Sequence, residues 1–582
     1  MTIRSPRRLP LCALAVLVSL YAATGPATAT TFVVTKTADT NDGFCNADCS
    51  LREAIIAANA NAGADIITLP AGTYTLTIAG QNEDAAATGD LDITGSVTIN
   101  GAGAATTIID GGAIDRVFHV ISGTVVINNV TIRNGLAASG DGGGILNAGA
   151  ATLTLNTVTL TNNHTASGGG AGILNNGVAT LTNSTITGNS AGGGGDGGGV
   201  NNQNTMTITG STVTVNSAGP SGGNGSGIDN SSDLTITNSV ISGNTGGGGG
   251  NGGGIHNSST LMLTSSTISG NSAGPSGGNG GGLYNSSTAT VTLGIISGNS
   301  AGTAGNGGGI FNSSTLTITD STVSGNTAPG GGDGAGIFDN GLSLTMNRST
   351  VSGNTTATGT GGGIYSDGVA ESITNSTISG NTAASAGGLF HDGIDVTVLD
   401  TTIASNTGGG IQNDGISVTL TNTIVANNGV NCSGTGAISD GGTNLQFPGT
   451  TCGASIASAD PLLQPLANNG GPTQTRALTV GSPAIDTGTT GCPPVPPTDQ
   501  RGVARPQGPA CDIGSFEFQA ATPTPTPTPT SVAAATPTPT GVPATPTPGQ
   551  GPTTAIPTLS WPMLALFGLG LAAAAVFFLR RS

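Results

Sequence analysis

The chain has 582 residues, of which 101 are glycine, 7% are charged and 3% are aromatic, and its formal net charge is −17. So acidic a chain repels phosphate backbones, which excludes nucleic acid as an expected partner. The shortage of lysine, glutamate, arginine and glutamine excludes a mainly helical fold.

Residues 1–29 have the features of a secretory signal peptide. Arginines between residues 4 and 8 precede an apolar stretch over residues 9–22, and small residues lead to a cleavage site at Ala29. Export places the mature chain in an oxidising compartment, where cysteines form disulfides by default.

The mature chain carries six cysteines. Sequence neighbours suggest three pairs, although six cysteines formally allow fifteen connectivities: Cys45 with Cys49, Cys432 with Cys452, and Cys492 with Cys511. Zinc binding is less favoured, because no pair of cysteines or histidines has zinc-ligand spacing.

The segment after Cys49 predicts a helix. Ser50 and Glu53 have the spacing of a capping box, apolar residues follow at helical spacing, and Gly63 provides a stop. The run Cys-Ser-Leu-Arg-Glu-Ala at residues 49–54 resembles the N-terminal signature of CSLREA-type surface proteins. We expect residues 30–63 to form a cap over the first coil of a solenoid, with Arg52 and Glu53 in structural rather than catalytic roles.

Residues 64–134 alternate apolar and polar side chains in short runs, which predicts irregular β-helix coils. Residues 135–430 then repeat one pattern with a period of about 27, which is typical of a stacked-repeat architecture. In each repeat a glycine run leads to an apolar residue and, two places later, usually to asparagine. The apolar positions are Ile145, Ile173, Val200, Ile228, Ile255, Leu283, Ile310, Ile337, Ile364, Leu389 and Ile411.

One repeat has room for three short strands and no helix. In residues 307–332 the strands are expected at residues 309–312, 316–319 and 321–324, with small apolar side chains inside and Thr and Ser outside. Helical solenoids of similar period need long apolar helices, which these repeats lack. The sequence therefore predicts an all-β fold, a parallel β-helix with about 27 residues per coil.

Asparagine and aspartate recur at three positions of the repeat. Because both residues suit turns and their amides can bond from coil to coil, we expect structural ladders. Calcium is the alternative at Asp141, Asp196 and Asp333, whereas neutral asparagine is a poor sole ligand for a divalent ion. The columns are Asn147, Asn175, Asn202, Asn230, Asn257, Asn285, Asn312 and Asp339; Asn189, Asn244, Asn271, Asn299, Asn326, Asn354 and Asn381; and Asp141, Asp196, Asn224, Asn251, Asn279, Asn306 and Asp333.

Residues 431–518 break the period. Their motifs include Asn-Asn-Gly-Gly-Pro-Thr-Gln-Thr-Arg at residues 468–476 and Gly-Ser-Pro-Ala-Ile-Asp at 481–486, and they resemble the choice-of-anchor Q domain. We expect a C-terminal cap in which the three arginines of this segment form ion pairs with its aspartates. These residues are Arg476, Arg501, Arg505, Asp486, Asp499 and Asp512.

The C-terminal segment has the features of a surface anchor. Residues 519–555 form a Pro/Thr-rich linker, and residues 556–582 resemble an IPTL-CTERM sorting tail. Within this tail the uncharged run Met563–Leu579 is a short membrane span followed by arginines. We expect the membrane to be a partner through this span.

The repeats also resemble those of polymorphic outer-membrane proteins, and the resemblances together imply a right-handed parallel β-helix on a bacterial surface. The predicted function is a non-enzymatic adhesin-like protein or stalk with an unknown surface ligand, without cofactor or catalytic residues. The alternative is a polysaccharide lyase or glycoside hydrolase. It lacks support in the repeats, where Arg348 is the sole arginine or lysine and the cluster of His391, Asp392 and Asp395 has no basic neighbour.

Overall fold

The computed structural model describes residues 28–81, 83–488 and 497–519. The remaining residues include almost all of the predicted signal peptide, Cys492, the linker from residue 520 and the sorting tail. No helix within the described residues is long and apolar enough to cross a membrane. The predicted span Met563–Leu579 lies outside them.

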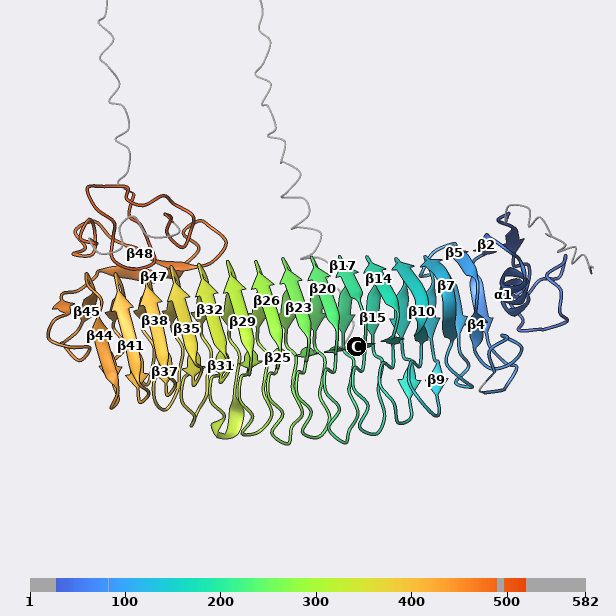
Figure 1. Cartoon of the computed structure of the whole chain (residues 1–582), viewed down its shortest axis with the longest axis horizontal. Helices are drawn as coiled ribbons and strands as arrows, with labels where there is room; N and C mark the ends of the chain where they lie inside the picture. Colours follow the sequence, from blue (N-terminus) through green and yellow to red (C-terminus); the bar gives the residue numbers. More distant parts are fainter. Residues whose placement is uncertain (1–27, 82, 489–496, 520–582) are drawn as a thin grey trace, which may run out of the picture. The chain divides into compact units, whose positions relative to one another are not determined.

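The chain winds into a parallel β-helix whose coils stack along one axis (Figure 1). Each regular coil supplies two strands to a 28-stranded sheet and a third to a 16-stranded sheet. One coil contains β28 (Ile310–Asn312), β29 (Thr315–Thr319) and β30 (Thr322–Ser324). They pair in parallel with β31 (Ile337–Asp339), β32 (Ser343–Asn347) and β33 (Thr350–Ser352) of the next coil. The all-β fold and the period of about 27 residues are confirmed.

The other regular coils repeat this arrangement. Their first strands are β13 (Ile173–Asn175), β16 (Val200–Asn202), β19 (Ile228–Asn230), β22 (Ile255–Asn257), β25 (Leu283–Asn285), β34 (Ile364–Ser366), β37 (Leu389–His391) and β40 (Ile411–Asn413). Their second strands are β14 (Val178–Thr182), β17 (Met206–Thr209), β20 (Asp233–Thr237), β23 (Thr260–Thr264), β26 (Thr288–Thr292), β35 (Ala370–Thr374), β38 (Asp395–Leu399) and β41 (Ser417–Thr421). Their third strands are β15 (Thr185–Thr187), β18 (Thr212–Thr214), β21 (Val240–Ser242), β24 (Thr267–Ser269), β27 (Ile295–Ser297), β36 (Thr377–Ser379), β39 (Thr402–Ala404) and β42 (Ile424–Ala426).

The two ends of the stack are less regular. The N-terminal coils contain β1 (Thr31–Val33), β2 (Ala64–Leu69), β3 (Gly72–Thr75), β4 (Leu91–Ile93), β5 (Ser96–Gly101), β6 (Thr107–Asp110), β7 (Phe118–Asn128), β8 (Thr131–Arg133), β9 (Leu136–Ala137), β10 (Ile145–Asn156), β11 (Thr159–Thr161) and β12 (His164–Thr165). The C-terminal end contains β43 (Cys432–Ser433), β44 (Ala437–Asp440), β45 (Leu445–Phe447), β46 (Ala457–Ser458), β47 (Leu463–Ala467) and β48 (Thr475–Leu478). A short 3-10 helix, η1, covers Pro329–Gly331.

The core is one column of small apolar side chains. In the example coil Ile310, Leu316, Ile318 and Val323 are at most 1% exposed. The residues between them face outward, because successive side chains of a strand point to opposite faces. The glycine run packs tightly outside this core: Gly307 has a φ of +66°, and a Cβ there would lie 2.4 Å from the carbonyl oxygen of Ile310. Glycine is therefore required at this corner.

All three predicted asparagine columns bond from coil to coil. Asn147 Nδ2 donates to Asn175 Oδ1 at 2.7 Å, and the first column continues in this way. In the third column the side chain accepts a backbone N–H of a neighbouring coil. There Asp141 Oδ1 accepts from Gly169 N, Asp196 Oδ1 from Asn224 N and Asp333 Oδ1 from Thr360 N. The three calcium candidates thus take part in the ladders.

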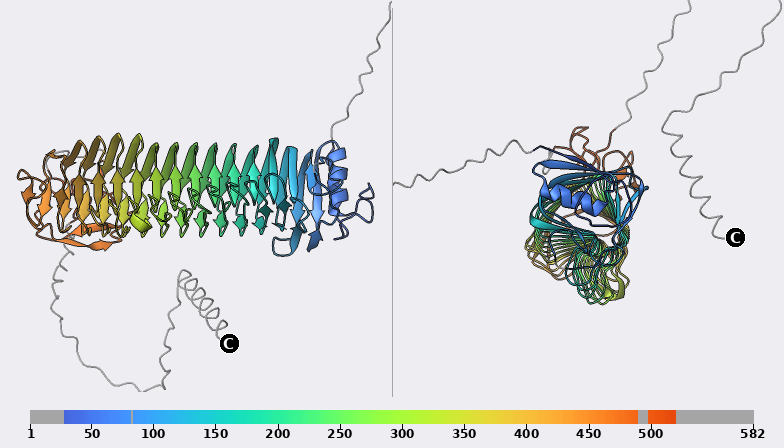
Figure 2. Two further views of the ribbon diagram at one scale, coloured as in Figure 1. Left: turned by 90° about the horizontal axis from the view of Figure 1, so that it is seen from below. Right: turned by 90° about the vertical axis from the view of Figure 1, so that its right-hand side faces the viewer.

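Helix α1 (Leu51–Ala60) covers the N-terminal end of the stack, and the C-terminal segment that forms the predicted cap lies along the side of the last coils (Figure 2). The helix starts at Ser50, whose capping box with Glu53 forms as predicted. Disulfides join Cys45 to Cys49 and Cys432 to Cys452. Cys511 is also disulfide-bonded, and its predicted partner Cys492 lies outside the described residues.

The C-terminal cap contains the antiparallel hairpin of β47 and β48. Gln500 fixes the cap to the coils: its Nε2 donates to Thr350 Oγ1 at 2.9 Å, and its Oε1 accepts from Thr377 Oγ1 at 2.6 Å. This buried amide therefore bridges two successive coils and the cap.

The predicted ion pairs of this cap are only partly correct. Arg501 pairs with Asp499 at 2.7 Å, but Arg505 pairs with Glu517 at 3.3 Å. The Arg476 Nε donates to Ser379 Oγ at 2.7 Å instead of to an aspartate. The carboxylate of Asp512 accepts the backbone N–H of Asp486, so Asp486 and Asp512 serve the backbone of the cap rather than the arginines.

The second asparagine column gives a direct test of the ladder. Asn271 is 1% exposed; its Oδ1 accepts from Asn244 N and Nδ2, and its Nδ2 donates to Ile241 O and Asn299 Oδ1. The change Asn271→Ala leaves these buried groups without partners, so we expect the free energy of unfolding to fall by about 2–4 kcal/mol. Chemical denaturation measures this change. As the control, Asn340→Ala at an exposed turn should change stability by less than about 0.5 kcal/mol; equal effects of the two substitutions would contradict a stabilising ladder.

Candidate functional site

The middle residue of each first strand faces outward, between two inward neighbours, and these residues form one column along the 28-stranded sheet. We call it the outward column. In coil order it contains Asp92, His119, Leu146, Leu174, Asn201, Asp229, His256, Tyr284, Phe311, Phe338, Tyr365, Phe390 and Gln412. Unlike the asparagine columns, it changes chemistry along the stack.

Six members of the outward column form an aromatic ladder from His256 to Phe390. Neighbouring ring centroids are 4.7–5.1 Å apart, and the planes deviate by at most 20°. Phe311, Phe338 and Phe390 are each only 8% exposed, so the ring faces contact one another instead of solvent. The ladder therefore stabilises the stack through ring contacts. Its signal in the sequence is an aromatic residue or histidine between the apolar residue and the Asn of consecutive repeats.

At the N-terminal end of the column lies a polar cleft of about 320 Å³. It is lined by Gln81, Glu83, Asp84, Asp90, Asp115, Arg116, His119, Ala138 and Ser139. The residues come from the loop before β4, from the segment leading into β7 and from the turn after β9. We did not predict this cleft, because its residues lie in the irregular coils, where no repeat places them.

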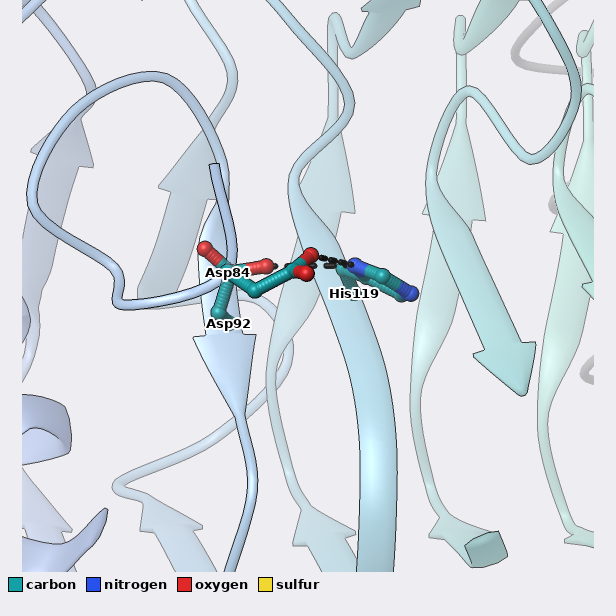
Figure 3. Close-up of side chains that lie close together, drawn as sticks. All are labelled: Asp84, Asp92 and His119. Carbon is teal, nitrogen blue, oxygen red and sulfur yellow. Dashed lines mark hydrogen bonds and ion pairs between the residues drawn. The ribbon is translucent and has the colours of Figure 1, made fainter. Parts of the chain in front are cut away.

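Three side chains meet at the edge of the cleft (Figure 3). His119 Nδ1 lies 3.1 Å from Asp92 Oδ1 and 3.6 Å from Asp84 Oδ1. Asp92 is fully buried, His119 is half-buried, and the side chain of Asp84 is 78% exposed. Nδ1 faces the two carboxylates, and the other ring nitrogen points away from them. Within the described residues, these three are the one group of three His, Cys, Asp or Glu side chains close enough to share a metal ion.

A second group of charges lies deeper in the cleft. Arg116 Nε is 3.6 Å from Asp90 Oδ2, beyond hydrogen-bond distance, and this buried Nε has no hydrogen-bond partner. Burial, together with the neighbouring Asp92, raises the pKa of Asp90 to about 8, and burial also raises the pKa of Asp115. The cleft thus combines one guanidinium with several carboxylates that repel each other.

Arg52 of the capping helix holds the loop that forms the cleft. Its fully buried guanidinium donates to the carbonyls of Ala86, Gly89 and Asp90 and pairs with Asp39 at 2.7 Å. Ala86, at a φ of +56°, in turn donates its N–H to Asp92 Oδ2 at 2.9 Å. The predicted structural role of Arg52 is therefore specific: it fixes the backbone that presents Asp84, Asp90 and Asp92.

The late-repeat residues His391, Asp392 and Asp395, for which the sequence predicts no catalytic role, lie in different environments. His391 is fully buried, whereas Asp392 and Asp395 are exposed. His391 Nδ1 lies 2.9 Å from Ser366 Oγ, which also donates to the Glu371 carboxylate. Ser366 and His391 continue the first asparagine column after Asp339.

This second cluster is buried. Burial, and then the neighbouring Asp339, raises the pKa of Glu371 to about 9, while burial lowers the pKa of His391. A Cβ at Gly368 would lie 2.6 Å from both Asp339 Oδ2 and Glu371 Oε1, so the two carboxyl groups meet beside this glycine. A protonated Glu371 can donate a hydrogen bond to Asp339, so the cluster continues the column in place of asparagine.

The chain matches the family model described as "Right handed beta helix region" over residues 117–293 and 169–370. This match and the fold together make it a right-handed parallel β-helix repeat protein. No curated protein sequence matches the chain.

Solved structures with some likeness include the A-module of the mannuronan C-5 epimerase AlgE4 of Azotobacter vinelandii, at 16% identity and a TM-score of 0.31, covering 70% of this chain and 97% of that one. The A-module of the AlgE6 epimerase of the same organism is 15% identical, with a TM-score of 0.31, covering 71% and 94%. The pectate lyase Pel9A is 15% identical, with a TM-score of 0.27, covering 84% and 96%. Likeness at this level says nothing about the activity of this chain.

Replacing Arg52 tests whether it holds the cleft loop. Lysine cannot reproduce the bonds of a planar guanidinium to Asp39 and to three carbonyls, so Arg52→Lys should lower the free energy of unfolding by about 3 kcal/mol and speed hydrogen exchange of amides 84–92. Arg133→Lys is the control, because Arg133 pairs with Asp110 at a more exposed position. Unchanged exchange at residues 84–92 would contradict the proposed role.

Glu371 predicts a pH dependence of stability. Its pKa is raised in the folded state, so between about pH 4.5 and 9 the unfolded chain loses a proton that the folded chain keeps. Stability should therefore fall with rising pH, by up to about 1.4 kcal/mol per pH unit. Glu371→Gln keeps the neutral form, and its melting temperature should decrease less than that of the wild type between pH 7 and 9. The exposed change Asp392→Asn is the control, and parallel wild-type and Glu371→Gln profiles would exclude a protonated Glu371.

Proposed function

We propose that this chain is a non-enzymatic cell-surface protein, an adhesin-like rod or structural stalk displayed through its C-terminal segment. The observation that supports this proposal is a two-row array of outward threonines along the 28-stranded sheet. We call it the threonine face.

The threonine face covers ten consecutive second strands, from β14 to β41. Most outward positions in both rows are threonine, and all are at least partly exposed: Thr180, Thr182, Thr207, Thr209, Thr235, Thr237, Met262, Thr264, Thr290, Thr292, Thr317, Thr319, Thr345, Asn347, Ser372, Thr374, Thr397, Leu399, Thr419 and Thr421. Strand pairing aligns them coil by coil, as in Thr290 with Thr317. Neighbours along the stack are thus about 4.8 Å apart, and the two rows are about 6.6 Å apart.

Such a face suits binding more than chemistry. It offers methyl and hydroxyl groups in a fixed lattice and carries no charged side chain. Exposed Asp233 and Asp395 flank the two rows on the same strands, and within the rows the repeated hydroxyls can contact an extended ligand, a protein or a polysaccharide, at many equivalent points. Many weak contacts then add to a strong overall attachment.

The sequence resemblances support the proposal that this rod is displayed on a bacterial surface. The CSLREA-type signature, the choice-of-anchor Q motifs and the IPTL-CTERM-like tail all point to export and anchoring, with the Pro/Thr linker as a spacer. The membrane contact through Met563–Leu579 and the signal peptide ending at Ala29 are parts of this proposal. No nucleic acid partner is expected, because the chain is acidic.

A second function, polysaccharide lyase or glycoside hydrolase, has one observation in its favour. The polar cleft places Arg116 beside Asp90 and Asp115, with His119 held by Asp92, and these are the residue types that sugar cleavage requires. The cleft lies away from the threonine face, in the N-terminal coils. Release of reducing ends or unsaturated products from a polysaccharide panel by the purified chain, and its loss in Arg116→Gln, would establish this function.

Charge placed on the threonine face tests the main proposal. In cells that display the chain, the triple change Thr235→Lys, Thr290→Lys and Thr317→Lys should reduce adhesion to the level of a deletion strain, because lysines disrupt close surface contact. The control places three lysines at exposed turn positions, Ser221, Ser276 and Thr303. It should leave adhesion unchanged, with both variants melting as the wild type. A deletion strain that adheres and keeps its envelope as the wild type does would reject the proposal.

A further inference from the structure

We propose that Asp84, Asp92 and His119 form a binding site for a first-row divalent transition metal ion at the edge of the polar cleft. The inference does not depend on the proposed adhesin function. It rests on the positions of three ligand atoms, on a matched pair elsewhere in the outward column, and on the groups that hold the ligands in place.

The ligand atoms have the spacing that one ion needs. Carboxylate oxygens and imidazole nitrogens bind such ions at about 2.0–2.2 Å, so ligands that share an ion lie roughly 3–3.5 Å apart. His119 Nδ1 lies 3.1 Å from Asp92 Oδ1 and 3.6 Å from Asp84 Oδ1, and all three atoms are within 4.8 Å of one another. A neutral imidazole has at most one proton on Nδ1 and can satisfy one carboxylate, whereas a shared cation satisfies both.

The outward column contains a matched pair without the third ligand. Asp229 and His256 pair across adjacent coils in the same register as Asp92 and His119, with His256 Nδ1 2.8 Å from Asp229 Oδ1. Asp196 lies near enough to His256 to interact with it electrostatically, but within the described residues no third His, Cys, Asp or Glu side chain completes a ligand group at this pair, and the His256 ring stacks on Tyr284 at 5.1 Å. One hydrogen bond between the two side chains explains why they lie so close together. The loop that brings Asp84 to His119 is therefore what distinguishes the proposed site.

The ligands are held before any ion binds. Ala86 N–H donates to Asp92 Oδ2, which leaves Oδ1 facing His119, and Arg52 holds Ala86 through its carbonyl. Such outer contacts orient metal ligands and strengthen their binding. Beyond them, the cleft offers space for additional ligands of the ion, and Arg116, whose Nε has no hydrogen-bond partner, also lines this cleft.

The donor set indicates the kind of ion. Imidazole nitrogen with carboxylate oxygen suits zinc, cobalt or manganese, whereas calcium takes six to eight oxygen ligands. The three protein ligands leave positions open toward the cleft, an arrangement typical of sites where the ion also binds an exchangeable molecule. The site differs from the calcium candidates Asp141, Asp196 and Asp333, which lie in the third ladder.

The test uses the full chain, with Zn²⁺ in isothermal titration calorimetry and Co²⁺ followed by its visible absorption. We expect one ion per chain at this site, and at least about tenfold weaker binding in Asp84→Asn and in His119→Gln. Asp84 is exposed, so Asp84→Asn should fold and melt as the wild type does. The matched control His256→Gln should bind both ions as tightly as the wild type.

Each possible result either supports or overturns the proposed metal site. Tight binding of Zn²⁺ and Co²⁺ that is lost in both cleft variants and kept in His256→Gln supports the site. Three results would overturn the proposal: no saturable binding of either ion, an affinity unchanged in Asp84→Asn, or an equal loss in His256→Gln. Calcium binding as tight as zinc binding would overturn the assignment to a transition metal.

Discussion

The structure depends on one constraint: a coil only about 27 residues long must satisfy every buried polar group through the coils above and below it. Backbone strands do most of this through parallel pairing, and the asparagine columns do the rest at the corners. Asn271 contacts two neighbouring coils through both ends of its amide and is almost fully buried. Apolar burial fills the interior, but these ladders determine where each turn lies.

The ladder also explains how the chain tolerates change. In three coils the first column has Asp339, Ser366 and His391 in place of asparagine. There Glu371 supplies hydrogen-bonding groups that an asparagine amide provides in the other coils. On the outer side the constraint is weaker, because solvent can satisfy what a neighbour does not. The outward column is therefore free to change from Asp and His to leucine and then to stacked rings. The aromatic ladder and two of the three ligands of the proposed metal site lie in this outward column and not in the asparagine columns.

Much of the fold could be predicted from the sequence, because periodicity reports contacts directly. Residues 27 apart share an environment, so the strands of the coil that begins at Ile310, the asparagine ladders and the capping box at Ser50 followed from the pattern. The cleft could not be predicted in this way. Asp84 and His119 belong to coils without a repeat, and only the fold shows that the loop carrying Asp84 is held against β7 by Arg52.

The errors in the C-terminal cap have the same cause. Arginines and aspartates of an irregular segment suggest ion pairs, but their partners depend on the path of the chain, and Glu517 and Ser379 took places expected for aspartates. The aromatic ladder was different, since its signal was present in six consecutive repeats. It was missed because each ring, taken alone, resembles an ordinary strand residue.

The close similarity of the regular coils has a consequence for the length of the rod. Between the N-terminal coils and those that the C-terminal cap contacts, a regular coil contacts only its two neighbours, so one complete coil can be gained or lost there without altering the contacts of either cap. Each such step changes the distance between the caps by about 4.8 Å and adds or removes one pair of outward threonines. The regular part of the stack thus sets the distance between α1 and the C-terminal cap in equal steps of one coil.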